Sequence, residues 1–164
     1  MIQRIYAWPL SAAILIVLIT LVGWSYFNLM IRQGVKVISI ICLFCAATIV
    51  ILYATILTRT PGVSEAILTP FASLTAARQQ PELYREMLMN VFLFFPLGLT
   101  LSNALPRKWH RWLRIILTTL VGCALSAGIE YAQYRYALGM AEVDDVICNT
   151  LGAFIGSTSL PIAP

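Results

Sequence analysis

Charged side chains are scarce in this sequence. Asp, Glu, Lys and Arg together make up 11% of the 164 residues, whereas a soluble domain carries about 25%. Hydrophobic residues make up 60% of the chain, and the mean hydropathy is +0.84. Too few ionisable groups remain to cover the surface of a water-soluble globule. The composition excludes an ordinary cytosolic enzyme, a secreted disulfide scaffold and a disordered tail, and it indicates an integral membrane protein.

Residues and motifs typical of catalytic sites are also scarce. The one histidine, His110, lies among basic residues, where we expect it near anionic lipid headgroups. The C-x-x-C of Cys42 and Cys45 lies in an apolar run without the βαβ context of a redox motif. The sequence has no G-x-S-x-G, no H-E-x-x-H and no glycine-rich phosphate loop. No familiar enzyme class, metal site or cofactor is therefore predicted.

Four long stretches without charge, and a fifth apolar stretch whose one charged residue is Glu130, define the expected membrane spans. At about 1.5 Å per residue, about 20 helical residues cross a hydrocarbon core of about 30 Å. The apolar runs are continuous and do not alternate as barrel strands do. We therefore predict an all-α, polytopic bundle of about five transmembrane helices, which forms one membrane domain over residues 1–164 with two helices in 1–58. The expected spans are 9–28, 37–57, 87–105, 115–134 and 145–162.

The net charge of +4 is better explained by the topology of a membrane protein than by a nucleic-acid partner. Four basic residues and no acidic residue lie within Pro106–Arg114, and the positive-inside rule places this connection in the cytoplasm. Counting spans from it puts the N-terminus outside the cell membrane and the C-terminus inside. The loop 59–86 and the Arg135–Asp144 turn are then expected at the outer face.

Polar side chains within the expected spans form the candidate site. Glu130 shares a helix face with Ser126 and Gln133, and Asp145 shares one with Asn149. A charged group at mid-membrane costs on the order of 2.5–3.5 kcal/mol, so we expect Glu130 to face a polar cavity between the fourth and fifth helices. The candidate residues are Asn90, Glu130, Gln133, Asp144, Asp145 and Asn149, with Glu86, Arg135 and Glu142 as auxiliary residues.

Simpler structural roles compete with this interpretation. The amides of Asn90, Gln133 and Asn149 suit hydrogen bonds between helices. Asp144 suits the cap of the fifth helix, where a carboxylate meets the positive end of the dipole. Small residues beside the polar ones, including the G-x-x-x-G at 152–156, are expected to let the fourth and fifth helices approach closely.

Three motifs occur in a fixed order in the second half of the chain. They are Asn90-Val-Phe-Leu-Phe-Phe-Pro-Leu-Gly98, Glu130-Tyr-Ala-Gln133 and Asp144-Asp145-Val-Ile-Cys-Asn149-Thr-Leu-Gly152, preceded by Leu68-Thr-Pro-Phe71. Over residues 65–158 they resemble the signature of VanZ-like membrane proteins. This resemblance implies a small multi-helix protein, and the member that names the family confers low-level resistance to the glycopeptide teicoplanin.

One position departs from the family pattern. Members usually carry an arginine directly after the glycine that precedes the acidic run, whereas Gly139 is followed here by Met140. Either Arg135 supplies the cation from the preceding turn, or the site has lost it. A site without a cation is poorly suited to an anionic ligand.

Three functions remain open at this point. The preferred one is binding or modification of membrane lipid, of a lipid-linked peptidoglycan precursor or of the glycopeptide itself at the outer face, with an effect on teicoplanin susceptibility. A lipid or drug transporter or flippase would use Glu130 as a proton carrier, and a chain this small would form a homo-oligomer to do so. An intramembrane hydrolase or transferase would use Glu130, Asp144 and Asp145 in acid–base chemistry or around a divalent cation.

Overall fold

The computed structural model describes residues 18, 23–27, 37–57, 59, 61–80 and 82–159. Most of the expected span 9–28 and the end of the expected span 145–162 lie outside the described residues. Within them, three helices are long and apolar enough to cross a membrane, namely Ile38–Leu57, Glu82–Ala104 and Arg111–Arg135. They correspond to the second, third and fourth expected spans, and the prediction of a mainly α-helical membrane bundle is confirmed.

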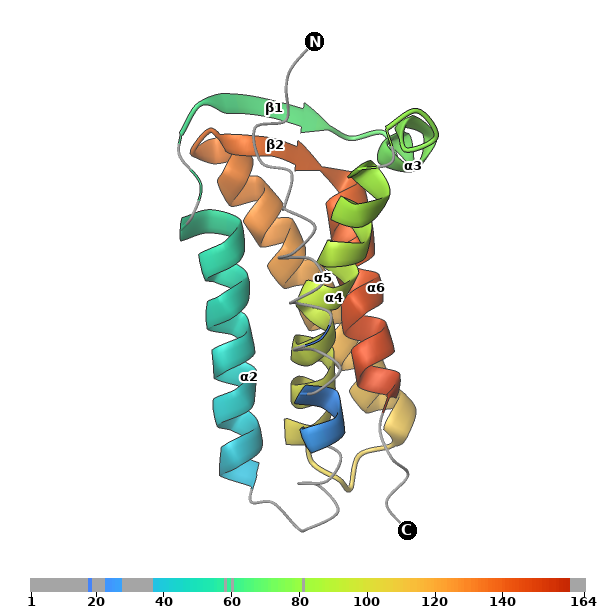
Figure 1. Ribbon diagram of the computed structural model, residues 1–164. Helices are drawn as coiled ribbons and strands as arrows, with labels where there is room; N and C mark the ends of the chain where they lie inside the picture. The colour runs from blue at the N-terminus through green and yellow to red at the C-terminus, as the bar shows by residue number, and fades with distance from the viewer. Residues whose placement is uncertain are drawn as a thin grey trace.

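The helices run side by side as a bundle. Their bounds are Val37–Leu52 for α2, Tyr53–Leu57 for the π-helical turn η1, Glu82–Ala104 for α4, Arg111–Arg135 for α5 and Val143–Thr158 for α6. Helices α4 and α6 begin at the same end of the bundle, and α5 runs back toward that end (Figure 1). With 16 residues, α6 is about 24 Å long. The helical part of the fifth expected span is therefore shorter than a hydrocarbon core of about 30 Å.

A two-stranded sheet covers one end of the bundle, and the apolar pattern did not predict it. Strands β1 (Val63–Ile67) and β2 (Leu138–Glu142) pair in parallel. Parallel strands need a long crossover connection, and here the crossover contains α4, α5 and the short helix α3, Ala72–Ala76 (Figure 1). The expected outer loop 59–86 and the Arg135–Asp144 turn thus form one cap, because each segment provides the pairing partner of the other.

Glycines bring the backbones of α4 and α6 into direct contact. A Cβ atom on Gly152 would collide with the carbonyl of Val91. A Cβ atom on Gly156 would collide in the same way with the carbonyl of Phe95. In a membrane, such small residues allow the close packing that holds helices together. The G-x-x-x-G of α6 therefore packs against α4, which corrects the partner expected for it. The close approach expected of the fourth and fifth predicted helices occurs at Gly122 instead.

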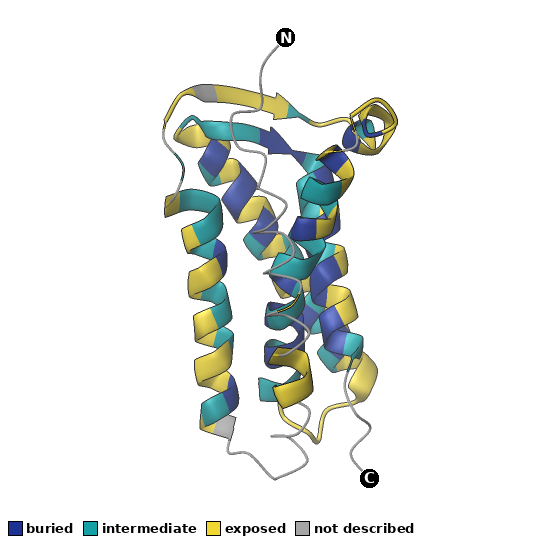
Figure 2. Cartoon of the chain, viewed as in Figure 1, coloured by how far each residue is buried: buried dark blue, intermediate teal, exposed yellow. Residues whose placement is uncertain are grey.

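Helix α5 joins this pair through a smaller contact. Ala153 of α6 lies between the two neighbouring helices, because a Cβ on Gly98 of α4 would meet its backbone and a Cβ on Gly122 of α5 would meet its side chain. The buried core continues from Ala153 to Phe94 and Ile51. Figure 2 shows the buried faces of α4, α5 and α6 turned toward one another, and a largely exposed outer face on α2.

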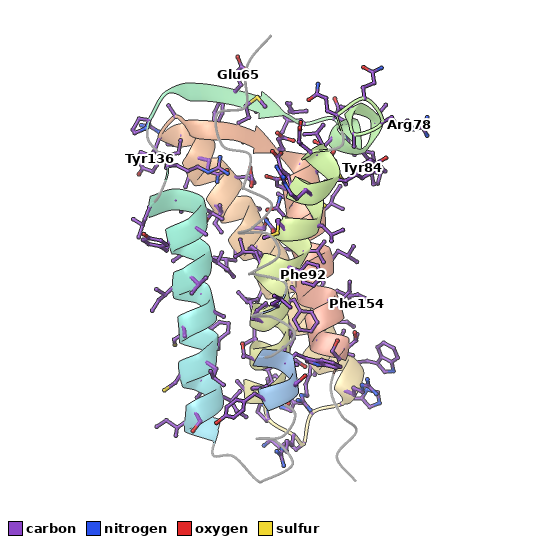
Figure 3. All side chains as sticks on the ribbon, in the orientation of Figure 1. Glu65, Arg78, Tyr84, Phe92, Tyr136 and Phe154 are labelled. Atoms are coloured by element: carbon purple, nitrogen blue, oxygen red, sulfur yellow. The ribbon has the colours of Figure 1, made fainter. Side chains whose placement is uncertain are left out.

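Exposed aromatic side chains mark both ends of the bundle. At the sheet end they are Tyr53, Phe71, Tyr84, Tyr131, Tyr134 and Tyr136, and at the opposite end Trp24, Tyr26, Trp109 and Trp112. Figure 3 shows Tyr84 and Tyr136 near the sheet, with Phe92 and Phe154 about halfway along the bundle. Trp and Tyr concentrate at membrane–water interfaces. From Trp112 to Tyr134, α5 covers about 33 Å, which matches a hydrocarbon core of about 30 Å.

The basic connection between α4 and α5 caps helix ends. Arg111 Nη2 donates to the carbonyl of Thr158 at 3.2 Å, and Arg114 Nε donates to that of Ser102 at 2.9 Å. Cations suit these C-terminal ends of α6 and α4 because the helix dipole is negative there. His110 caps the start of α5, where its Nδ1 accepts from Trp112 N at 3.3 Å. The basic segment therefore has a structural role in addition to the topological one predicted for it.

The α4–α6 contact predicts unequal effects of two glycine substitutions. Gly152→Ala forces a methyl group against the Val91 carbonyl, and overpacking of this kind typically costs about 1–3 kcal/mol. Gly128 of α5 has open space around its Cβ position, so Gly128→Ala should be neutral or slightly stabilising. Thermal unfolding in detergent should show a lower Tm for Gly152→Ala only. Equal Tm values for both variants would contradict the packing described.

The positions of the basic connection and the sheet at opposite ends allow a direct test of the predicted topology. Lys108 and Glu65 are both exposed, and Glu65 lies at the sheet end (Figure 3). In a background without the four native cysteines, an impermeant thiol reagent applied to intact cells should label a cysteine at position 65. A cysteine at position 108 should react only after permeabilisation. The reverse pattern would place the sheet in the cytoplasm.

Candidate functional site

The predicted site residues gather beneath the sheet, where α5 ends and α6 begins. Glu130, Gln133, Glu142, Asp144 and Asn149 are buried, with exposed fractions between 2% and 7%. Glu86, Asn90 and Asp145 are half-buried, and Arg135 is exposed. The structure therefore brings the acidic and amide residues of α5, β2 and α6 together and leaves Arg135 at the surface.

Glu130 is bound to the strand that leads into α6. Its Oε2 accepts a hydrogen bond of 3.0 Å from the backbone N–H of Glu142. A hydrogen bond from a backbone N–H stabilises a buried carboxylate and at the same time satisfies a buried strand donor. The side chain therefore faces the protein interior, and it ties the last turns of α5 to the start of α6.

Asp144 binds the beginning of α3 rather than its own helix. Its Oδ1 and Oδ2 accept from the backbone N–H groups of Phe71 at 2.6 Å and Ser73 at 2.7 Å. The N-cap residue of α6 is Glu142, whose side chain makes no capping hydrogen bond to α6. The simpler interpretation of Asp144 as the cap of the fifth helix is therefore wrong, because both of its oxygens are directed to a segment that lies about 70 residues earlier in the chain.

The contact with Asp144 gives a structural role to the Leu68-Thr-Pro-Phe71 segment. Phe71 adopts a left-handed backbone conformation with φ 62°, which is uncommon for a bulky residue. The conformation directs two backbone donors toward Asp144. Ser73 adds a second link, since its Oγ donates to Glu142 Oε2 at 2.6 Å. Two acidic residues thus hold α3 over the end of the bundle.

Two buried amides connect neighbouring helices. Asn149 Nδ2 of α6 donates to Ser126 Oγ of α5 at 2.9 Å, and Gln133 Nε2 of α5 donates to the carbonyl of Thr55 in η1 at 2.9 Å. These are the interhelical bonds that the simpler interpretation predicted for amides. The carbonyl oxygens of both amides are buried without a donor among the described residues. The site therefore has unused acceptors.

Arg59 lies beside strand β2, and it was not among the residues that the sequence predicted for the site. A Cβ atom at position 139 would lie 2.5 Å from Arg59 Nη1. Arg59 stands between η1 and β1, about 70 residues before Glu130. No local motif could reveal the approach of Arg59 to Gly139. Among the described residues, the guanidinium beside Gly139 is thus that of Arg59, whereas Arg135 is exposed.

The geometry does not favour a divalent cation held by Glu130, Asp144 and Asp145. Both oxygens of Asp144 are taken by backbone donors. In the part of the chain that the structure describes, no three His, Cys, Asp or Glu side chains are placed to hold one metal ion. The arrangement is better suited to binding a hydrogen-bond donor than to coordinating a metal with oxygen ligands.

The bond between Glu130 and strand β2 predicts different outcomes for two substitutions. Glu130→Gln keeps an acceptor for the Glu142 N–H and should fold at near-normal abundance. Glu130→Leu leaves that buried donor unpaired, at a cost of about 1–3 kcal/mol. Quantitative blotting of membranes and Tm in detergent should both fall for the leucine variant. Equal values for the two variants would mean that the hydrogen bond does not contribute to stability.

Comparisons with known proteins agree with the resemblance seen in the sequence. The model of the family described as VanZ/LLP1 matches residues 37–163. A curated relative, Protein VanZ of Enterococcus faecium, is 38% identical over 73 residues, which is 44% of this chain and 42% of the relative. The match therefore spans less than half the length of that relative. No solved structure matches the chain.

Proposed function

This chain belongs to the VanZ/LLP1 family, and we propose that it binds an envelope lipid or a lipid-linked cell-wall precursor at the outer face of the cell membrane. Binding of this kind would change the susceptibility of the cell to teicoplanin, which is the property that the resemblance to VanZ-like proteins implies. The proposal concerns a binding function and assigns no reaction to the protein.

The observation that carries the proposal is the surplus of buried acceptors. Gln133 Oε1 and Asn149 Oδ1 have no donor among the described residues. The orientation of Gln133 is set by the Thr55 carbonyl, which can only accept a hydrogen bond. A buried polar atom without a partner costs about 1–3 kcal/mol. A ligand that offers hydroxyl, amide or ammonium donors would recover this cost, and envelope lipids and cell-wall precursors carry such groups.

The depth of the site supports a ligand at the membrane surface. Glu130 lies about one helical turn inside Tyr134, which belongs to the aromatic side chains of the sheet end. Interfacial aromatic residues lie at the level of the lipid headgroups. A headgroup at that level is within reach of the site. A water-soluble ligand would gain nothing from a site at that depth.

The half-buried Asp145 offers a test that separates function from folding. Asp145→Asn removes one charge at nearly constant volume, so the protein should reach normal abundance. In cells whose teicoplanin tolerance depends on this protein, most of that tolerance should be lost. Glu65→Gln is the matched control, because Glu65 is an exposed acid at the same end (Figure 3), and it should retain tolerance. Full tolerance of Asp145→Asn at matched abundance would contradict the proposal.

Lipid analysis distinguishes binding from the other two functions. Cells with and without the protein should contain the same lipid species if the protein only binds its ligand. A chemically modified lipid that depends on Glu130 would indicate a hydrolase or transferase instead. Proton-coupled movement of lipid across vesicles that contain the purified protein would indicate a transporter.

A further inference from the structure

An exposed apolar segment lies at the sheet end, outside the spanning helices. Residues 66–77, which run from the end of β1 through α3, contain no charged residue. Three of their large hydrophobic side chains are exposed, namely Leu68 at 76%, Phe71 at 56% and Leu74 at 42%. An apolar surface of this kind marks a place where a protein or a membrane binds.

The length of α6 gives the depth of this segment. At the C-terminal end of α6, the carbonyl of Thr158 accepts from Arg111, the first residue of α5, next to the exposed Trp112. An exposed tryptophan at this place is typical of a membrane boundary. With 16 residues, α6 extends about 24 Å from that boundary. Because a hydrocarbon core is about 30 Å thick, the first turn of α6 lies just inside the opposite boundary.

Asp144 holds the exposed segment at the depth of this first turn. It belongs to the first turn of α6, and its two oxygens accept from the backbone N–H groups of Phe71 and Ser73. The Ser73 hydroxyl also donates to Glu142 Oε2 at 2.6 Å. Ser73 is therefore buried, while Phe71 stays exposed. Figure 1 shows α3 beside the starts of α4 and α6.

The surface next to the segment is one that lipid covers. Ile147 and Leu151 follow Asp144 by three and seven residues, which places them on the same face of α6, and both are exposed. In a membrane bundle this apolar face meets lipid, so the segment continues a lipid-facing surface. Arg78, which follows the charge-free run, is exposed beside α3 (Figure 3). Long basic side chains extend from apolar surroundings to the lipid headgroups.

We propose that residues 68–78 form an in-plane membrane anchor, in which Leu68, Phe71 and Leu74 pack among acyl chains directly beneath the headgroups at the sheet end. The anchor completes the apolar surface of α6, which ends short of the membrane boundary. Asp144 is a positioning residue for this anchor. The inference goes beyond the proposed binding function, and it holds whichever ligand the polar site binds.

Spin labelling in lipid vesicles tests the anchor. The full chain without its four native cysteines receives a nitroxide at Leu74→Cys and is reconstituted in phosphatidylcholine. Oxygen concentrates among acyl chains and a nickel chelate stays in water, so the ratio of their collision rates with the label reports lipid contact. The ratio should be well above that of Glu65→Cys, an exposed acid on β1, and below that of Leu120→Cys, which is exposed further from the sheet end on α5.

Two results of this measurement would overturn the proposal. A ratio at Leu74→Cys equal to that at Glu65→Cys would mean that the segment faces water. Low collision rates with both reagents would mean that protein, either a second copy of the chain or another partner, covers the segment in place of lipid.

A substitution of Asp144 tests how the anchor is held. Asp144→Asn presents one acceptor oxygen in place of two, so one of its two backbone donors loses its partner. The label at Leu74→Cys should then become more mobile and its oxygen-to-nickel ratio should fall. Glu65→Gln is the matched control and should change neither property. An unchanged spectrum and ratio in Asp144→Asn would refute the positioning role.

A second variant covers the case in which Asp144→Asn yields too little protein. Ser73→Ala removes only the hydroxyl bond to Glu142 and leaves both backbone donors to Asp144 in place. The label at Leu74→Cys should again gain mobility relative to the Glu65→Gln control. The same mobility in Ser73→Ala and in the control would count against the proposed attachment of the anchor.

Discussion

A carboxylate buried at the edge of a membrane must receive donors from the protein, and this requirement organises the sheet end of the bundle. Glu130 takes the N–H of Glu142, Glu142 takes the hydroxyl of Ser73, and Asp144 takes two backbone donors at the start of α3. The strands and α3 are thus more than a connection between helices. They provide the hydrogen bonds without which three buried acids would be strongly destabilising.

The arrangement of the helices places most of these acids at the positive end of a helix dipole, which stabilises negative charge. Direct contact of α4 and α6 through Gly152 and Gly156 sets the two helices in parallel, so their positive ends meet at the sheet end and their negative ends meet Arg111 and Arg114. Helix α5 runs the other way and brings Glu130 to the same end with the opposite dipole. Glu130 therefore lacks the dipole stabilisation that Asp144 and Asp145 receive in the first turn of α6.

Local patterns were enough to predict the helices and the members of the site. Long apolar runs predicted the positions of α2, α4 and α5, because a helix needs about 20 apolar residues to cross lipid. Glu130 and Gln133 share a face because residues three apart on a helix are neighbours. Both statements rest on helix geometry and on the cost of charge in lipid, and neither needs knowledge of the rest of the chain.

Only the tertiary structure decided which residues provide hydrogen-bond partners for the buried side chains of the site. Three contacts each join segments about 70–80 residues apart. They are the pairing of β1 with β2, the binding of Asp144 to the backbone at Phe71 and Ser73, and the approach of Arg59 to Gly139. Such contacts leave no periodicity in the sequence, and the strand Leu138–Glu142 contains a glycine and no β-branched residue to signal itself. The sequence by itself determined a membrane bundle with a polar cluster at one end. Only the packing of α4, α5 and α6 decided which donors that cluster receives, because those donors belong to distant segments that folding brings together.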